Sequence, residues 1–279
     1  MKKIHLFLGL LIISLLTSCA VPQKPYYQVY KAEGLGNLVK KDNAYTFEDE
    51  NCIISYNLWK NGGDIGFEIY NKRDENIYLN LEECFFVLNG IAHNYYKNRI
   101  FTFSKSQGIA NARSSKSSSI YNSPSLSNLV YNASINSIGL SSSSGSSTAY
   151  NEEKIVCIPP KTSKSVREYA ISDYTYRAAD LFFFPRMKQV QPKRFLVTNS
   201  PFVFGNMLAF STEKDKSLIR VENNFYVSEI TNYPDFALTE LKLEEYFGQK
   251  GTSYIKQFKS TPPDKFYFTY YRGGQIWKH

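Results

Sequence analysis

The stretch CIISYNLWKNGGDIGFEI, residues 52–69, decides the fold predicted for this chain. Apolar side chains occupy every second position from Cys52 to Leu58, and again from Ile65 to Ile69. This period of two is that of a β-strand, because successive side chains of a strand point to opposite faces. Asn61-Gly62-Gly63 lies between the two runs and favours a tight turn. The stretch therefore predicts a β-hairpin.

Further alternation follows this hairpin. Ile77, Leu79 and Leu81 repeat the period, and the apolar run 85–88 is followed by Asn89-Gly90. Asn-Gly is the dipeptide most typical of a two-residue hairpin turn. Additional strands are predicted at 202–210, 218–221, 225–230 and 265–271. The chain is accordingly predicted to be mainly β.

One short helix is predicted near the C-terminus, at residues 235–247. Asp235 can cap its first turn, Phe236, Leu243 and Phe247 fall near one face, and Gly248 suits its C-terminal end.

Composition agrees with a β protein. The chain has 22 Tyr and 20 Phe but only 2 Trp, and aromatic residues suit half-buried sheet surfaces. Stacking on carbohydrate is the alternative use of such aromatics. Beyond Cys19, the three cysteines Cys52, Cys84 and Cys157 lie in apolar runs, so we expect three buried free thiols. Their spacing does not fit a zinc site.

Two segments resemble immunoglobulin-like sandwich modules of bacterial secreted proteins. Residues 70–79, YNKRDENIYL, match the pattern in which a polar turn joins two core strands. Residues 155–166, IVCIPPKTSKSV, match a strand that ends at proline before a polar turn. The resemblance implies an immunoglobulin-like antiparallel β-sandwich over residues 44–172, followed by a further β-rich region over 173–279.

A Ser-rich tract interrupts the proposed sandwich. Residues 104–148 contain 18 Ser. The tract has too few apolar side chains to offset the entropy of ordering the chain. We expect a long disordered insertion, either without a binding role or serving as a binding loop or glycosylation platform.

The N-terminus resembles the lipobox signal peptide of bacterial lipoproteins. Lys2-Lys3 precede the apolar run 4–16, and Leu16-Thr17-Ser18-Cys19 follow the lipobox pattern. The apolar run is shorter than the roughly 20 residues of a membrane-spanning helix. The resemblance implies that residues 1–18 are a removed signal peptide and that Cys19 carries the lipid. Residues 19–43, which contain Pro22 and Pro25, are predicted to form the lipidated cysteine and a tether.

Location follows from the same resemblance. A lipid on Cys19 implies an envelope protein anchored in the outer membrane. Ala20, instead of Asp, and the absence of an acidic run after Cys19 favour the periplasmic face over the cell surface. The chain as a whole resembles uncharacterised lipoproteins of Gram-negative bacteria, which implies no activity.

Catalytic and metal-binding patterns are scarce. His93 and His279 are the only histidines after residue 18, so no metal site is expected, and no cofactor is indicated. No Ser lies in a G-x-S-x-G motif. The adjacent pairs Glu82-Glu83 and Glu152-Glu153 would point to opposite strand faces. The net charge of +8 is spread along the chain, and no nucleic-acid recognition motif is present.

These patterns predict a non-enzymatic, lipid-anchored module that binds or scaffolds another envelope component, either a protein or a polysaccharide. The residues predicted to form its binding loop, besides the insertion, are His93, Tyr95, Tyr96 and Arg99. Two alternatives stay open. One is a polysaccharide-acting hydrolase with two carboxylates from distant strands. The other is a structural subunit that assembles through a free sheet edge.

Overall fold

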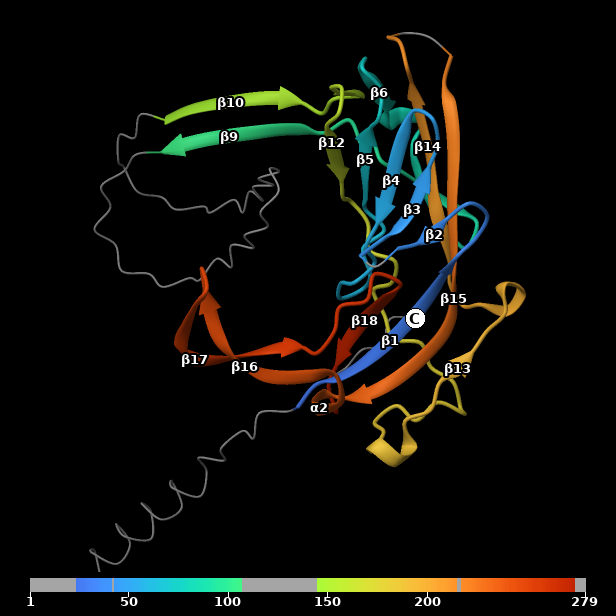
Figure 1. The fold of residues 1–279 in the computed structure, drawn as a ribbon, viewed down its shortest axis with the longest axis vertical. Coiled ribbons are helices and arrows are strands. Elements are labelled where there is room, and N and C mark those ends of the chain that lie inside the picture. The colour runs from blue at the N-terminus through green and yellow to red at the C-terminus, as the bar shows by residue number, and fades with distance from the viewer. Residues whose placement is uncertain (1–23, 42, 107–144, 215–216, 274–279) are drawn as a thin grey trace, which may run out of the picture.

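The protein is mainly β, with antiparallel sheets, in a computed structural model that describes residues 24–41, 43–106, 145–214 and 217–273 (Figure 1). The larger sheet has nine strands: β1 (Tyr26–Gly34), β6 (Ile77–Asn80), β7 (Phe85–Leu88), β8 (Ile91–Asn94), β11 (Ile155–Ile158), β13 (Lys193–Arg194), β14 (Val203–Ser211), β15 (Ile219–Pro234) and β18 (Lys265–Tyr270). The smaller sheet has five: β2 (Val39–Lys40), β3 (Tyr45–Glu48), β4 (Cys52–Tyr56), β5 (Phe67–Asn71) and β12 (Ser163–Val166).

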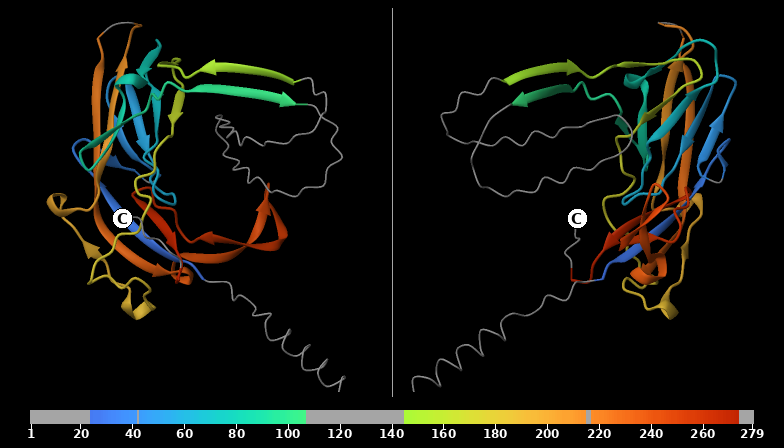
Figure 2. Two further views of the ribbon diagram at one scale, coloured as in Figure 1. Left: turned by 180° about the vertical axis from the view of Figure 1, so that it is seen from behind. Right: turned by 60° about the vertical axis from the view of Figure 1, so that its left-hand side comes forward.

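Two further hairpins stand apart from both sheets. They are β9 (Ile100–Ser106) with β10 (Gly145–Asn151), and β16 (Thr239–Tyr246) with β17 (Gln249–Phe258). Among the described residues, the helical elements are α2 (Asp235–Leu238), η1 (Leu81–Glu83), η2 (Met187–Gln189) and η3 (Val197–Asn199). Both hairpins project from the same side of the body (Figures 1 and 2).

The predicted opening hairpin is confirmed. Strands β4 and β5 pair antiparallel, with Cys52 opposite Asn71, and alternate side chains of both strands are buried. Gly62 and Gly63 have φ angles of 81° and 79°, a region that L side chains avoid. A Cβ on Gly63 would lie 2.7 Å from Cδ1 of Ile171, so the turn is packed against the core.

The larger and the smaller sheet face one another across a core rich in aromatic residues. Phe225 of the larger sheet has its ring 5.3 Å from the rings of both Tyr45 and Tyr56 of the smaller sheet. The strand orders are β11-β6-β14-β15-β1-β18 and β12-β5-β4-β3-β2. The immunoglobulin-like topology stays a prediction, because these orders do not establish it.

The predicted tether, residues 19–43, is wrong in its extent. Residues 26–34 form β1, a strand inside the larger sheet that pairs with β15 on one side and β18 on the other. Tyr30 is fully buried and stacks on Phe266 at 4.5 Å. The buried Gln28 is satisfied by the backbone N–H of Tyr176 at 2.6 Å and by Oδ1 of Asn232 at 2.8 Å. Gln28 therefore belongs to the core, because its hydrogen bonds are made internally.

The predicted helix at 235–247 is also wrong beyond its first turn. Only Asp235–Leu238 are helical, and Thr239–Tyr246 form β16, paired with β17. Residues 240–243 alternate polar and apolar side chains, a pattern that suits a strand once a partner is present. Phe247 and Gly248 have φ angles of 50° and 81° and make the two-residue turn.

Two other predictions are modified. Strands β9 and β10 include both ends of the predicted insertion 104–148. Residues 107–144 of this insertion lie outside the described part of the chain, and so does Cys19. Cys52 and Cys84 are buried free thiols as expected, but Cys157 is exposed, because it faces outward on the edge strand β11 between the buried Val156 and Ile158.

Candidate functional site

The predicted binding loop does not form one surface. Tyr95 is buried, and its hydroxyl donates a 2.9 Å hydrogen bond to Oδ1 of Asn206 in the core. His93 is exposed on β8, with its ring 5.8 Å from those of Phe86 and Tyr169. Tyr96 donates its hydroxyl hydrogen to Asn98 at 2.8 Å.

Arg99, the fourth predicted residue, braces the base of the β9–β10 hairpin. Its Nε lies 3.0 Å from Oε1 of Glu152, and its Nη1 lies 3.0 Å from Oε1 of Glu168. Lys97 adds a 2.7 Å ion pair to Glu168. Burial acts to raise the pKa of Glu152, but hydrogen bonds from Arg99 and from the backbone of Lys97 outweigh it and lower that pKa. Each charged side chain of this cluster therefore has a partner within the chain.

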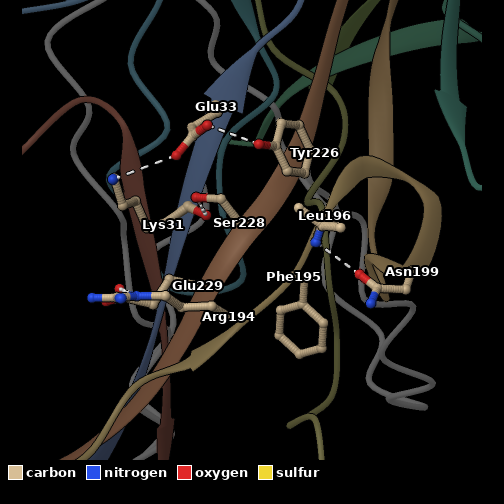
Figure 3. Close-up of a pocket in the computed structure, with 9 residues that line it drawn as sticks. All are labelled: Lys31, Glu33, Arg194, Phe195, Leu196, Asn199, Tyr226, Ser228 and Glu229. Carbon is tan, nitrogen blue, oxygen red and sulfur yellow. Dashed lines mark hydrogen bonds and ion pairs between the residues drawn. The ribbon is translucent and has the colours of Figure 1, made fainter.

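A pocket of about 290 Å³ lies where β15 changes its neighbour from β14 to β13 (Figure 3). Its floor is irregular because the β1–β15 register shifts at Lys31/Ala32, which places Ser228 as an extra residue. Such bulges redirect side chains. The pocket is lined by Lys31, Glu33, Arg194, Phe195, Leu196, Asn199, Tyr226, Ser228 and Glu229.

The charges of this pocket are paired across the lining (Figure 3). Glu33 accepts a 2.8 Å hydrogen bond from the Tyr226 hydroxyl, which lowers the pKa of Glu33 and raises that of Tyr226. Lys31 lies 3.5 Å from Glu33, and Arg194 lies 3.4 Å from Glu229. Two cations and two carboxylates beside Phe195 suit a small polar ligand. The lining contains no histidine or cysteine. The sequence does not predict this pocket, because Lys31 and Glu33 fall within the predicted tether.

The β16–β17 hairpin carries several exposed apolar side chains. Leu241 and Tyr254 are 68% and 69% exposed, and Phe247 at the turn is fully exposed. Leu243 is the cross-strand partner of Tyr254, so Leu241, Leu243 and Tyr254 share one face. Within the described ranges, neither strand pairs with anything except the other. The hairpin therefore presents both an apolar face and two free backbone edges.

Comparisons with protein families, with curated proteins and with solved structures found no match. Among the described residues, no helix has the length and apolar character needed to span a membrane. The same residues contain no group of three or more His, Cys, Asp or Glu side chains placed to hold a metal ion.

Proposed function

We propose that this chain is a lipid-anchored protein of the bacterial outer membrane, on the periplasmic face, that binds another envelope protein without catalysing a reaction. The observation that carries the binding role is the β16–β17 hairpin. The lipobox pattern at Leu16–Cys19 supports the anchor.

The hairpin is attached firmly at its base and free along its length. Phe258, the last residue of β17, packs its ring 5.0 Å from Trp59, 5.2 Å from Tyr27 and 4.6 Å from Tyr267. Lys256 pairs with Asp235, and the backbone N–H of Lys259 donates to the carbonyl of Leu238 at 2.9 Å. Beyond this base, no residue of β17 is buried.

A hairpin of this kind gains from a partner. An isolated two-stranded hairpin is marginally stable in water, because one face of a two-stranded sheet buries too little apolar surface. Addition of a strand from another protein would satisfy the free N–H and C=O groups of one edge. The face that carries Leu241 and Tyr254 offers the same partner an apolar surface to pack against. The hydrolase alternative has less support than the binding role. Both carboxylates of the pocket in Figure 3 are in ion pairs, whereas a hydrolase needs carboxylates available to its substrate.

The test is site-specific photo-crosslinking in living cells. A photo-reactive residue replaces Leu241, and a matched one replaces Ile155, an exposed residue on β11. We expect a crosslinked protein of defined mass from position 241 alone. In parallel, residues 240–257 are replaced by a short Gly-Asn turn, and the thermal midpoint of the purified protein is measured. We expect the midpoint to be retained and the same partner to be lost from co-purification.

The anchor is tested separately. Cys19→Ser should move the protein from the membrane fraction to the periplasmic fraction, and mass spectrometry of the N-terminal peptide should identify acyl chains on the wild-type cysteine. Equal crosslinking at 241 and 155 would remove the hairpin as the binding surface, whereas an unmodified Cys19 would remove the anchor.

A further inference from the structure

Three strand ends meet at one end of the larger sheet. Tyr26, the first residue of β1, lies opposite Pro234 at the end of β15 and opposite Tyr270 at the end of β18. Figure 1 shows these ends together beside α2. We call this region the anchor end, because the segment that leads back to Cys19 begins here.

The lipid would hold the anchor end close to the bilayer. Because β1 begins at Tyr26, only residues 20–25 separate it from Cys19. A chain spans at most about 3.6 Å per residue, so the seven steps from Cys19 to Tyr26 reach at most about 25 Å. A tether extending to residue 43 would allow the body to lie much farther from the bilayer than this length allows.

Exposed aromatic side chains gather at the anchor end. Phe236 lies in α2, two residues after Pro234, and is 61% exposed. Tyr271 directly follows β18 and is 43% exposed. Phe182 is 51% exposed, and its carbonyl accepts a 2.9 Å hydrogen bond from Asn232 of β15. Aromatic side chains favour the interface between lipid headgroups and acyl chains.

Basic side chains accompany these rings. The Arg272 guanidinium lies 5.3 Å from the ring of Phe184, which itself packs on Tyr26 at 5.2 Å. The ammonium group of Lys259 lies 2.8 Å from the carbonyl oxygen of Phe236. The nearby carboxylate of Asp235 is paired with Lys256, so it does not offset the charge of Arg272 or Lys259. Cationic groups beside exposed rings suit a surface of anionic lipid.

We propose that the anchor end, through Phe182, Phe236, Tyr271, Lys259 and Arg272, rests on the anionic phospholipid surface of the membrane that holds the lipid. This contact rests on the proposed anchor at Cys19 and adds a second attachment to it. It would fix the orientation of the body and keep the base of the β16–β17 hairpin near the membrane.

The experiment measures contact with lipid at one introduced tryptophan. Phe236→Trp and, as the matched control, Ile155→Trp are made in a Trp277→Phe background, so that Trp59 is the shared reference. Ile155 lies at the opposite end of the larger sheet from the anchor end. Its neighbour Val156 is in register, across β6 and β14, with Ile219, the first residue of β15. The lipidated proteins are reconstituted into vesicles of phosphatidylethanolamine and phosphatidylglycerol with or without brominated acyl chains.

We expect brominated lipid to quench the Phe236→Trp emission at least about twofold more than the Ile155→Trp emission. A second variant, Phe236→Ser with Tyr271→Ser, should weaken binding of the unlipidated Cys19→Ser protein to the same vesicles, while Ile155→Ser should not. If mass spectrometry shows that the protein is lipidated and the two variants are quenched equally, the lipid contact is overturned and the anchor is retained.

If Cys19 carries no lipid, the proposed anchor fails, and the same vesicles are then used with the unanchored protein. Retention of the quenching difference would support the lipid contact by itself, and its loss would overturn it.

Discussion

The hydroxyl of Tyr95 donates a 2.9 Å hydrogen bond to Oδ1 of Asn206 inside the core, and Nδ2 of Asn206 donates in turn to the carbonyl of Ile65 at 2.9 Å. Tyr95 comes from the segment between β8 and β9, Asn206 from β14 and Ile65 from the turn before β5. One amide side chain thus links three distant parts of the chain. The finding moves Tyr95 from the predicted binding loop into the structural core.

Removal of the Tyr95 hydroxyl should therefore destabilise the protein. Tyr95→Phe leaves a buried acceptor on Asn206 without this donor, which costs about 1–3 kcal/mol. Urea denaturation should show this loss. Tyr96→Phe is the matched control, because the Tyr96 hydroxyl bonds to Asn98 in an exposed position, and we expect almost no change. Equal stability of the two variants would contradict the assignment of Tyr95 to the core.

Glu152 should make the protein acid-sensitive. Burial would raise the pKa of its carboxyl, but hydrogen bonds from Arg99 and the backbone lower it in the folded state. A carboxyl whose pKa is lowered in the folded state stabilises the protein at pH values above its ordinary pKa of 4.5. This stability is lost as the pH falls through the lowered pKa. Glu152→Gln should lose about 1–2 kcal/mol at pH 7 and should lose less further stability below pH 4.5 than the wild type.

The measurement is the urea midpoint of wild type and variant from pH 7 to pH 3. Glu153→Gln serves as control, because Glu153 is adjacent in sequence but exposed. A wild-type acid profile in Glu152→Gln would show that another carboxylate governs this range.

Thiol labelling should distinguish Cys157 from the two core cysteines. Burial raises the pKa of Cys84 to about 12 and also raises that of Cys52, so neither forms the reactive thiolate at neutral pH. In the Cys19→Ser protein, a maleimide reagent should add once to the native state, at the exposed Cys157, and three times after denaturation. Cys157→Ser should abolish the native reaction. Rapid native labelling of Cys52 or Cys84 would contradict the core described above.

Gly63 should tolerate alanine less well than Gly36. Both have positive φ angles, 79° and 67°, so both variants are strained in the backbone. Only at Gly63 would the added Cβ meet core atoms, at 2.7 Å from Ile171 and 3.0 Å from Phe266, whereas nothing lies within 4 Å at Gly36. We expect Gly63→Ala to be about 1–3 kcal/mol less stable than Gly36→Ala by urea denaturation. A reversed order would show that this turn is not packed as described.

Local sequence predicted the β4–β5 and β7–β8 hairpins, because turn chemistry and alternation act over a few residues. It did not predict the β9–β10 and β16–β17 hairpins. Asn89 and Gly90 adopt positive φ angles of 48° and 83° and join β7 to β8, as their dipeptide predicts. The pocket of Figure 3 could not be predicted in this way. It depends on the pairing of Lys31 with Glu229 and of Arg194 with Glu229, which brings together segments far apart in the chain.

By itself, then, the sequence determined that this is a β protein with particular hairpins, because φ preferences and side-chain alternation are local properties. Tertiary structure decided the rest. Residues 26–34 became a strand within a sheet because β15 and β18 supply partners on both sides. Residues 239–246 became a strand rather than a helix because 249–258 folds back on them. In both segments the side-chain pattern was compatible with more than one structure, and backbone hydrogen bonds to a partner strand selected one.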